Sequence, residues 1–168
     1  MRPRLRAMKG TGIEIDVTLR VRCSPRNGPL LRRVASHAAR AEGFRRGVLS
    51  IAVVGRRAMS TLHLRHMRVQ GPTDVLTFDL GTDRKRRWIE GEIVVCRDVA
   101  ASVCRSGYGA GISPRAIERE LALYVTHGVL HLAGYDDHDP QDFRRIHTRE
   151  NQILSQLSLG KAFGNIIE

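Results

Sequence analysis

Two histidines four residues apart carry the clearest chemical signal in the sequence. His127 and His131 stand at the start of the run HGVLHLAGYDDH. Residues four apart on an α-helix project from one face, about 6 Å apart along the axis, so both imidazoles can bind one metal ion. A glycine turn follows the second histidine and sends the donor atoms of Asp136, Asp137 and His138 back toward that face. The spacing predicts a metal site on a helix followed by a glycine turn.

The donor set favours a catalytic zinc site over a structural one. Catalytic Zn²⁺ has three protein ligands of nitrogen or oxygen and leaves one position for water, whereas structural zinc is usually closed by four ligands rich in cysteine. No cysteine lies near the two histidines in the sequence. Gly128 stands where HExxH zinc peptidases carry their general-base glutamate, which disfavours that mechanism. We therefore expect one Zn²⁺ per chain and hydrolysis of another kind.

The element that must position the histidines is a long helix. Ser113 and Pro114 are a typical helix start, and Gly134 supplies a stop, so the helix is expected from there to about residue 133. A further amphipathic helix is expected to reach about residue 157, with an apolar face of four residues: Phe143, Ile146, Ile153 and Leu157.

The rest of the chain reads as alternating strands and helices. Alternating or short apolar runs predict strands over 12–21, 48–54, 74–78 and 92–96, and amphipathic patterns predict helices over 30–41 and 58–67. The run at 92–96 is apolar on both faces, which favours a central place in a sheet. The order β-α-β-α-β-β-α-α predicts an α+β fold, with helices packed on a small mixed sheet.

Length and composition favour a single domain over 1–168, with 42% hydrophobic and 27% charged residues. Residues 1–11 are expected to be a disordered extension and 160–168 a tail. The segment SGYGAG at 106–111 lacks the Gly-Lys-Ser/Thr ending of a phosphate-binding P-loop, so it is expected to be a flexible lead-in to the histidine helix. No apolar run approaches the roughly 20 residues that cross a bilayer, so no membrane partner is expected.

Cysteine usage and the start of the chain favour a cytoplasmic location. The three cysteines form no CxxC pair and are an odd number, so no disulfide framework is expected. The basic residues at 1–9 are not followed by the apolar stretch of about 7 to 15 residues that a secretory signal has.

Positive charge is concentrated in the first part of the chain. Residues 1–70 hold 16 Lys or Arg against 3 Asp or Glu, whereas residues 71–168 hold 12 against 14. Clustered arginine attracts phosphate backbones and stacks on bases, which favours an RNA partner. The alternative is a basic surface that only maintains solubility. Aromatic residues make up 5% of the chain, so selection of RNA by shape or by a partner is expected over reading of bases.

Three motifs together resemble the YbeY family of bacterial endoribonucleases, also called rRNA maturation factors. They are PTDVLTF at 72–78, GEIVV at 91–95 and HGVLHLAGYDD at 127–137, and the resemblance spans roughly residues 48–150. It implies a zinc-dependent, single-strand-specific endoribonuclease that acts in 16S rRNA 3′-end maturation and ribosome quality control in the cytoplasm. The implied partners are the 16S rRNA precursor and a ribosomal subunit or the ribosome, with no DNA. The implied fold places the HGxLH helix against a mixed four-stranded sheet.

The third metal ligand is where the sequence departs from that family. The common family motif has a third histidine six residues after the second, and Asp137 stands there, followed by His138. A carboxylate can replace an imidazole on zinc at nearly the same bond length. A one-residue bulge would bring in His138 instead, but it must re-route the backbone, so Asp137 is favoured. Asp136 is expected to orient an imidazole or cap the turn, and by proximity it is also a candidate general base.

A second departure concerns phosphate binding. The family often has an arginine five residues before the proline of its PTDVLSF motif, and that place is Met67 here, between Arg65 and Arg68. Arg68 is the predicted phosphate contact, and a solvated arginine at a helix end is the alternative. Thr73 and Asp74 are expected to fix the loop that enters the strand.

The expected reaction is attack on an RNA phosphodiester by a zinc-bound water whose pKa falls toward about 7, with arginine stabilising the transition state. A route through the RNA 2′-hydroxyl is equally open. Two other functions remain as alternatives. One is a non-catalytic ribosome- or RNA-binding assembly factor whose metal is structural, and the other is a metal-dependent hydrolase of a different substrate.

Overall fold

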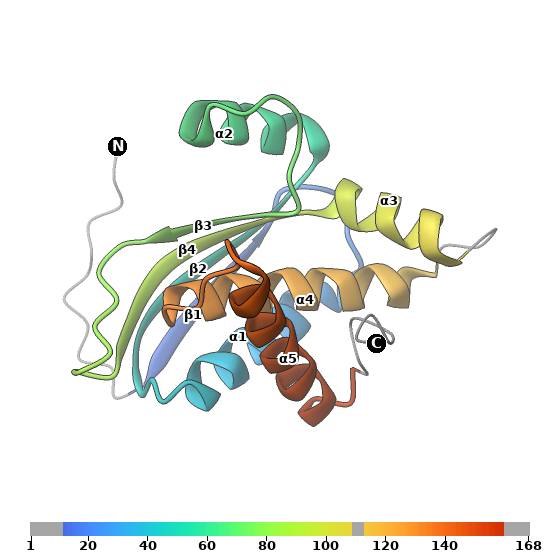
Figure 1. The fold of residues 1–168 in the computed structure, drawn as a ribbon. Coiled ribbons are helices and arrows are strands. Elements are labelled where there is room, and N and C mark those ends of the chain that lie inside the picture. Colours follow the sequence, from blue (N-terminus) through green and yellow to red (C-terminus); the bar gives the residue numbers. More distant parts are fainter. Residues whose placement is uncertain (1–11, 109–112, 160–168) are drawn as a thin grey trace.

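The structure is a computed structural model that describes residues 12–108 and 113–159. Its elements, in chain order, are β1 (Ile13–Leu19), α1 (Asn27–Ala41), β2 (Arg46–Val54), α2 (Arg56–Met67), β3 (Val75–Asp79), β4 (Trp88–Cys96), α3 (Arg97–Tyr108), α4 (Pro114–Leu132) and α5 (Pro140–Gln156). Figure 1 shows their arrangement. The expected extension at 1–11, the expected tail at 160–168 and residues 109–111 of the expected lead-in lie outside the described residues.

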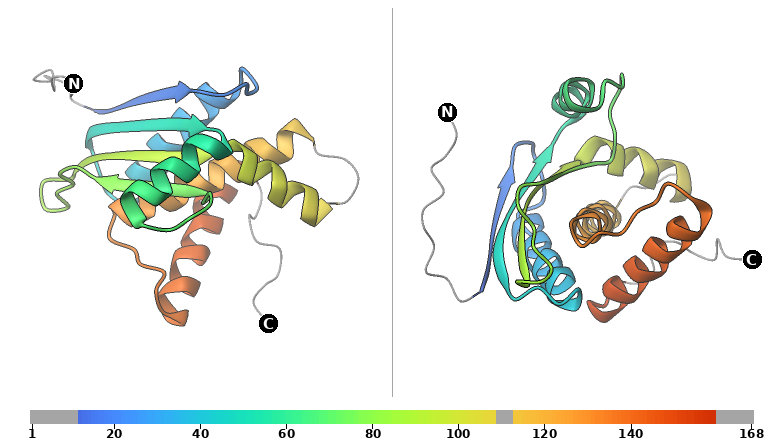
Figure 2. Two further views of the ribbon diagram at one scale, coloured as in Figure 1. Left: turned by 90° about the horizontal axis from the view of Figure 1, so that it is seen from above. Right: turned by 60° about the vertical axis from the view of Figure 1, so that its left-hand side comes forward.

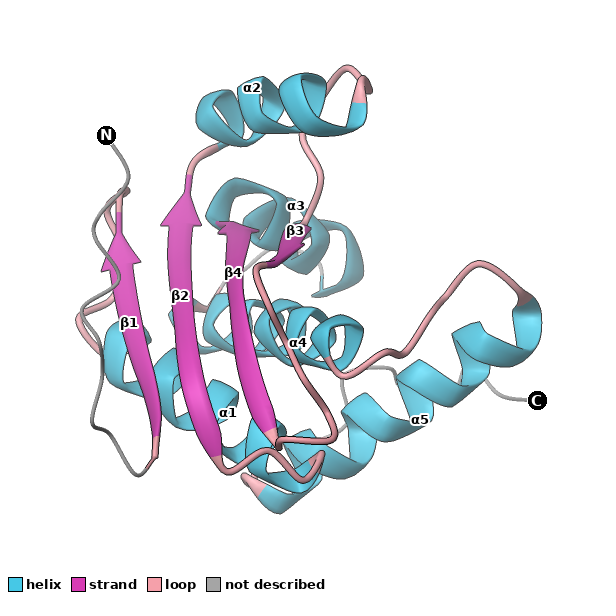
Figure 3. Cartoon of the chain, turned by 90° about the vertical axis from the view of Figure 1, so that its left-hand side faces the viewer, coloured by secondary structure: helices cyan, strands magenta, loops and turns pink. Residues whose placement is uncertain are grey.

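The strands form one mixed sheet in the order β1-β2-β4-β3. Strands β1, β2 and β4 are parallel, and β3 runs antiparallel to β4 (Figure 3). Strand β4 lies between two neighbours, and its last four residues are buried, as expected for the apolar run at 92–96. The predicted α+β class with a small mixed sheet is therefore confirmed.

Helices cover the two faces of the sheet unequally. Helices α1, α4 and α5 lie on one face and α2 lies on the other (Figures 1 and 2). The larger core lies between the sheet and α1, α4 and α5, whereas the smaller core under α2 consists of Ala52, Val54, Met59, Leu76, Val94 and Cys96. The histidine helix α4 therefore belongs to the larger core, where other elements surround it. Among the described residues, no helix is long and apolar enough to span a membrane.

Both ends of α4 form as the sequence predicts. Ser113 is the N-cap, and its hydroxyl oxygen accepts a hydrogen bond from the backbone N–H of Ala116 at 3.1 Å. The helix ends at Leu132, and Gly134 adopts a φ of +89°, a left-handed conformation that favours glycine. The last turn of the helix is thus followed at once by the reversal that leads to residues 135–139.

The predicted element order is wrong at one point, because it lacks α3. Residues 106–108, expected in a flexible lead-in, belong to the end of this helix. Its buried residues include Ala100, Ala101 and Cys104. Such small side chains produce a weaker periodic signal than the large apolar residues of α1 or α5, although they still fill the space beside α4.

The predicted apolar face of α5 is also partly wrong. Ile146 and Ile153 are buried and Leu157 is partly buried, but Phe143 is 51% exposed. Phe143 lies in the first turn of α5, and its ring contacts the ring of His147, with centroids 4.1 Å apart. This aromatic ring therefore lies on the surface instead of in the core.

Two glycines allow α4 to lie close to the sheet. A Cβ atom on Gly128 would lie 2.8 Å from Cγ2 of Ile93 and 2.9 Å from Oγ1 of Thr77. On the facing strand, a Cβ atom on Gly91 would lie 2.6 Å from Cδ1 of Leu132. These distances are too short for real carbon contacts, so only glycine fits this packing without a shift of the helix or the strand.

We expect Gly128→Ala to lower the free energy of unfolding by about 1–3 kcal/mol, because the added methyl group overpacks the contact between α4 and the sheet. Urea denaturation followed by circular dichroism measures this change. Gly28→Ala is the matched control, since Gly28 also lies in a helix and has no atom within 4 Å of an added Cβ. Equal stability of the two variants would contradict the close packing.

Candidate metal centre

The two predicted histidines of α4 lie side by side. Their Nε2 atoms are 2.8 Å apart, and their ring centroids are 4.4 Å apart. Both side chains are largely covered, because α4 is packed between the sheet and α5. The helical spacing therefore brings His127 and His131 together on one face, as the sequence predicts.

The other ring nitrogen of each histidine is held by an acceptor. Oε1 of Glu150 accepts a hydrogen bond from Nδ1 of His127 at 2.6 Å, and the backbone oxygen of Tyr135 accepts one from Nδ1 of His131 at 3.0 Å. A carboxylate or a carbonyl oxygen can only accept, so both Nδ1 atoms carry hydrogen. Each ring is therefore oriented with Nε2 facing the other histidine.

The surroundings shift the pKa values of the two histidines in opposite directions. Burial disfavours protonation of His127, but the hydrogen bond and the negative charge of Glu150 outweigh it, so the pKa of His127 is raised. Burial and the positive charge of His127 lower the pKa of His131. With both Nδ1 atoms bonded to acceptors, the two Nε2 atoms are the nitrogens that a metal cation can bind.

Asp137 completes a group of three donors. Its Oδ2 lies 3.6 Å from Nε2 of His127 and 3.8 Å from Nε2 of His131. Tetrahedral zinc with bonds of about 2.0–2.2 Å holds its ligand atoms about 3.4 Å apart, and the three distances here lie on both sides of that value. Two imidazoles, one carboxylate and oriented rings fit a divalent metal of the zinc type.

His138 and Asp136 are not part of the group formed by His127, His131 and Asp137. His138 is 86% exposed, and its Nδ1 contacts Oδ1 of Asp136. The same carboxylate accepts a hydrogen bond from the backbone N–H of Asp137 at 2.8 Å, so it stabilises the turn. The hydrogen bond from His138 lowers the pKa of Asp136. Asp136, Asp137 and His138 also form a possible donor group, but it is exposed and includes neither helix histidine.

Arg68 lies at the left-handed C-cap of α2, with a φ of 61°. Among the described residues, no hydrogen bond or ion pair connects Arg68 with the histidine pair. Thr73 and Asp74 do fix the entry to β3, because Oδ1 of Asp74 accepts hydrogen bonds from the Thr73 hydroxyl at 2.9 Å and the backbone N–H of Val75 at 2.8 Å.

Two further residues, Glu150 and His147, belong to the site and were not predicted from the sequence. Glu150 is fully buried, and its second oxygen accepts a hydrogen bond from Nδ1 of His147 at 2.6 Å. A signal for Glu150 was present, because it lies four residues after Ile146 and three before Ile153, on the apolar face of α5. A carboxylate at such a position is buried and needs hydrogen-bonded partners.

We expect Glu150→Gln to lower the affinity of the protein for zinc about 10- to 100-fold, because the negative charge that fixes the orientation of His127 is lost while the size of the side chain is kept. Competition with a chromophoric chelator at constant pH measures the affinity. The matched control is Glu118→Gln, which removes one charge near the start of α4, and an equal loss in both variants would contradict the role of Glu150.

Similar proteins share most of the length of this chain. The protein named Endoribonuclease YbeY of Frankia alni is 39% identical over 117 residues, which cover 64% of this chain and 61% of that protein. The protein of the same name from Chlorobium luteolum is 37% identical over 130 residues, which cover 76% of this chain and 87% of that protein. This chain thus spans about three fifths of the length of the Frankia alni relative.

The fold is also found in a solved structure. The solution structure of TM1509 from Thermotoga maritima matches with a TM-score of 0.57 and 22% identity, covering 93% of this chain and 99% of that one. A family model described as Endoribonuclease YbeY matches residues 23–158, a range that contains α4, the glycine turn and α5. Sequence, fold and the position of the histidine helix thus agree, and the chain belongs to the YbeY family.

Proposed function

We propose that this protein is a zinc-dependent endoribonuclease that cleaves single-stranded RNA. The observation that carries the proposal is the pair of Nε2 atoms held 2.8 Å apart on a largely covered helix face, with both Nδ1 atoms engaged and a carboxylate beside them. The names of the relatives support RNA as the substrate and cleavage within the strand as the reaction.

His127, His131 and Asp137 are the residues that would hold one zinc ion per chain. A zinc ion bound there supplies a Lewis acid for a phosphoryl oxygen and lowers the pKa of a bound water toward about 7. Glu150 and the backbone oxygen of Tyr135 keep the two imidazoles in the orientation that this binding needs.

Asp136 and Arg68 are the proposed residues for proton transfer and phosphate contact. Asp136 is next to Asp137 and is exposed, so its carboxylate can accept the proton that leaves the attacking hydroxyl group. That hydroxyl belongs to water or to the ribose of the RNA. Arg68 is an exposed guanidinium near the end of α2, which suits contact with a phosphate of a long substrate.

The proposed substrate is the 16S rRNA precursor near its 3′ end, in ribosome maturation and quality control in the cytoplasm. The support is the motif resemblance to this family, together with the excess of arginine over 1–70, which favours attraction to the phosphates of a ribosomal particle. Cosedimentation with purified small ribosomal subunits at several salt concentrations tests the partner separately from the reaction.

We expect about one zinc per chain in wild-type protein purified without added metal. Zinc is expected to be lost in His131→Ala and in Asp137→Ala, because each removes one of three ligands, and to be kept in His138→Ala, whose ring faces Asp136. Mass spectrometry of the metal content measures this. Zinc that stays in His131→Ala would contradict the proposed ligand set.

Cleavage of RNA is expected to require the bound metal. A labelled unstructured RNA should be cut internally by the wild type, stay intact after treatment with a chelator and be cut again after zinc is returned. His138→Ala is the matched control for His131→Ala in this assay. An RNA that the zinc-loaded wild type leaves intact would contradict the endoribonuclease proposal, whereas cutting that continues after complete metal removal would contradict its metal dependence.

A further inference from the structure

An exposed aromatic ring lies next to the metal centre. Phe143 is 51% exposed, and its ring meets that of His147 edge to face, with an interplanar angle of 76°. The His147 ring in turn lies 6.4 Å from the ring of His127, with an angle of 25° between them. Phe143 is therefore two rings away from a proposed zinc ligand, and its ring is exposed at the surface.

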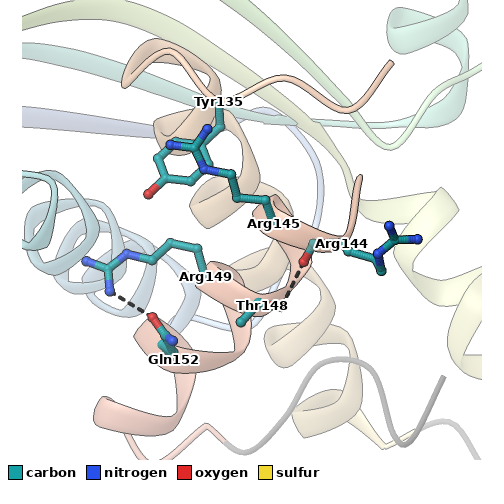
Figure 4. Close-up of a pocket in the computed structure, with 6 residues that line it drawn as sticks. All are labelled: Tyr135, Arg144, Arg145, Thr148, Arg149 and Gln152. Atoms are coloured by element: carbon teal, nitrogen blue, oxygen red, sulfur yellow. Dashed lines mark hydrogen bonds between the residues drawn. The ribbon is translucent and has the colours of Figure 1, made fainter. Parts of the chain in front are cut away.

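Two arginines follow Phe143 along the helix and line a hollow of about 390 Å³. Figure 4 shows Arg145 extending along the ring of Tyr135, while Arg144 leaves α5 on another side. The Arg145 Cζ atom lies 5.1 Å from the centroid of that ring. Such stacking holds a guanidinium group in place and leaves its N–H edges available to an anion.

The charge of the hollow is positive and not neutralised. Arg149, which also lines it, is occupied, because its Nε donates to Glu42 at 2.6 Å and its other nitrogens donate to the backbone oxygen of Ala41 and to Gln152. Glu42 is thereby paired. The guanidinium groups of Arg144 and Arg145 have no hydrogen-bond or ion-pair partner within residues 12–108 and 113–159.

We propose that the first two turns of α5 form a strand-binding surface, in which Phe143 stacks on one base of a single-stranded RNA and Arg144 and Arg145, which leave the helix on other sides, contact phosphates further along the strand. An aromatic ring for bases together with guanidinium groups for phosphates is how proteins bind single strands without reading their sequence. This inference rests on the proposed function and names the residues that hold its substrate.

Negative charges precede the strand-binding surface in the sequence, and positive groups are needed to offset them where a phosphate binds. The turn and the first turn of α5 contain four carboxylates: Asp136, Asp137, Asp139 and Asp142. Carboxylates repel phosphate, so an RNA strand that passes this acidic run gains from positive groups close to it. Arg144 and Arg145 are the arginines that follow this acidic run in the sequence. A stacked base adds attraction that does not depend on charge.

Binding of a 12-nucleotide, fluorescently labelled 2′-O-methyl RNA to the zinc-loaded full chain tests the surface. Anisotropy is measured at several salt concentrations, and a gel confirms that the probe stays intact. Phe143→Ala should weaken binding at least about fivefold without changing the salt dependence, and Phe143→Trp should retain binding. The double variant Arg144→Ala/Arg145→Ala should weaken binding about tenfold and reduce the salt slope by about 1.4, or about 0.7 for each lost phosphate contact.

The matched control is Arg32→Ala/Arg33→Ala, which removes an exposed pair of neighbouring arginines from another helix, α1. It should change binding less than about twofold, since it lowers only the overall charge. Equal losses in both double variants, or wild-type binding by the α5 variants, would overturn the inference. If the wild type cleaves RNA and the α5 variants bind normally, the strand-binding surface fails and the proposed function stands. If the wild type does not cleave but binding depends on α5, the surface stands and the proposed function fails.

Discussion

One hydrogen bond between two helices orients the first histidine of the candidate metal centre. Glu150 on α5 accepts from Nδ1 of His127 on α4, and this contact fixes which nitrogen of His127 faces His131. Burial of a carboxylate costs several kcal/mol, and the two imidazoles that donate hydrogen bonds to the two oxygens of Glu150 offset that cost. Because this acceptor lies on the next helix along the chain, His127 takes this orientation only when α5 packs on α4. The chemistry of the site is thus tied to the tertiary fold.

The distance between α4 and the sheet is the second constraint. Gly128, directly after the first histidine, and Gly91 on β4 leave no space for a Cβ atom between helix and sheet. With one face so close to the sheet, the histidines can project only toward the side that α5 and the following turn cover. Gly134 then reverses the chain so that Asp137 returns to them. The motif HGVLHLAGYDD therefore combines packing residues with donors, and its glycines are as necessary as its histidines.

The features that the sequence predicted are those that depend on local rules. Helical spacing placed His127 beside His131, and a serine cap and a glycine stop defined α4. The missed features depend on contacts between distant segments. Glu150 is 23 residues from His127 in the sequence, so only the packing of α5 on α4 reveals its partner. The exposure of Phe143 likewise depends on where the hydrophobic core ends. The periodicity of apolar residues within one helix does not show where that is.

Net charge summed over halves of the chain hides the pattern that matters near the metal centre. Residues 1–70 carry most of the positive charge, but α4, the turn and α5 all lie in the half whose net charge is slightly negative. Salt screens charges beyond about 8 Å at physiological ionic strength, so distant arginines attract RNA to the protein but do little for one phosphate at the histidines. The charges close to the histidines therefore decide whether a phosphate is attracted there. Four aspartates favour a cation. Arg144 and Arg145, which have no ion-pair partner in the part of the chain that the structure describes, lie within three residues of the last aspartate and favour a phosphate. A metal ion and a phosphate need surroundings of opposite charge, and here the two kinds of charge follow one another along the chain, with the aspartates in the turn and at the start of α5 and the arginines directly after them.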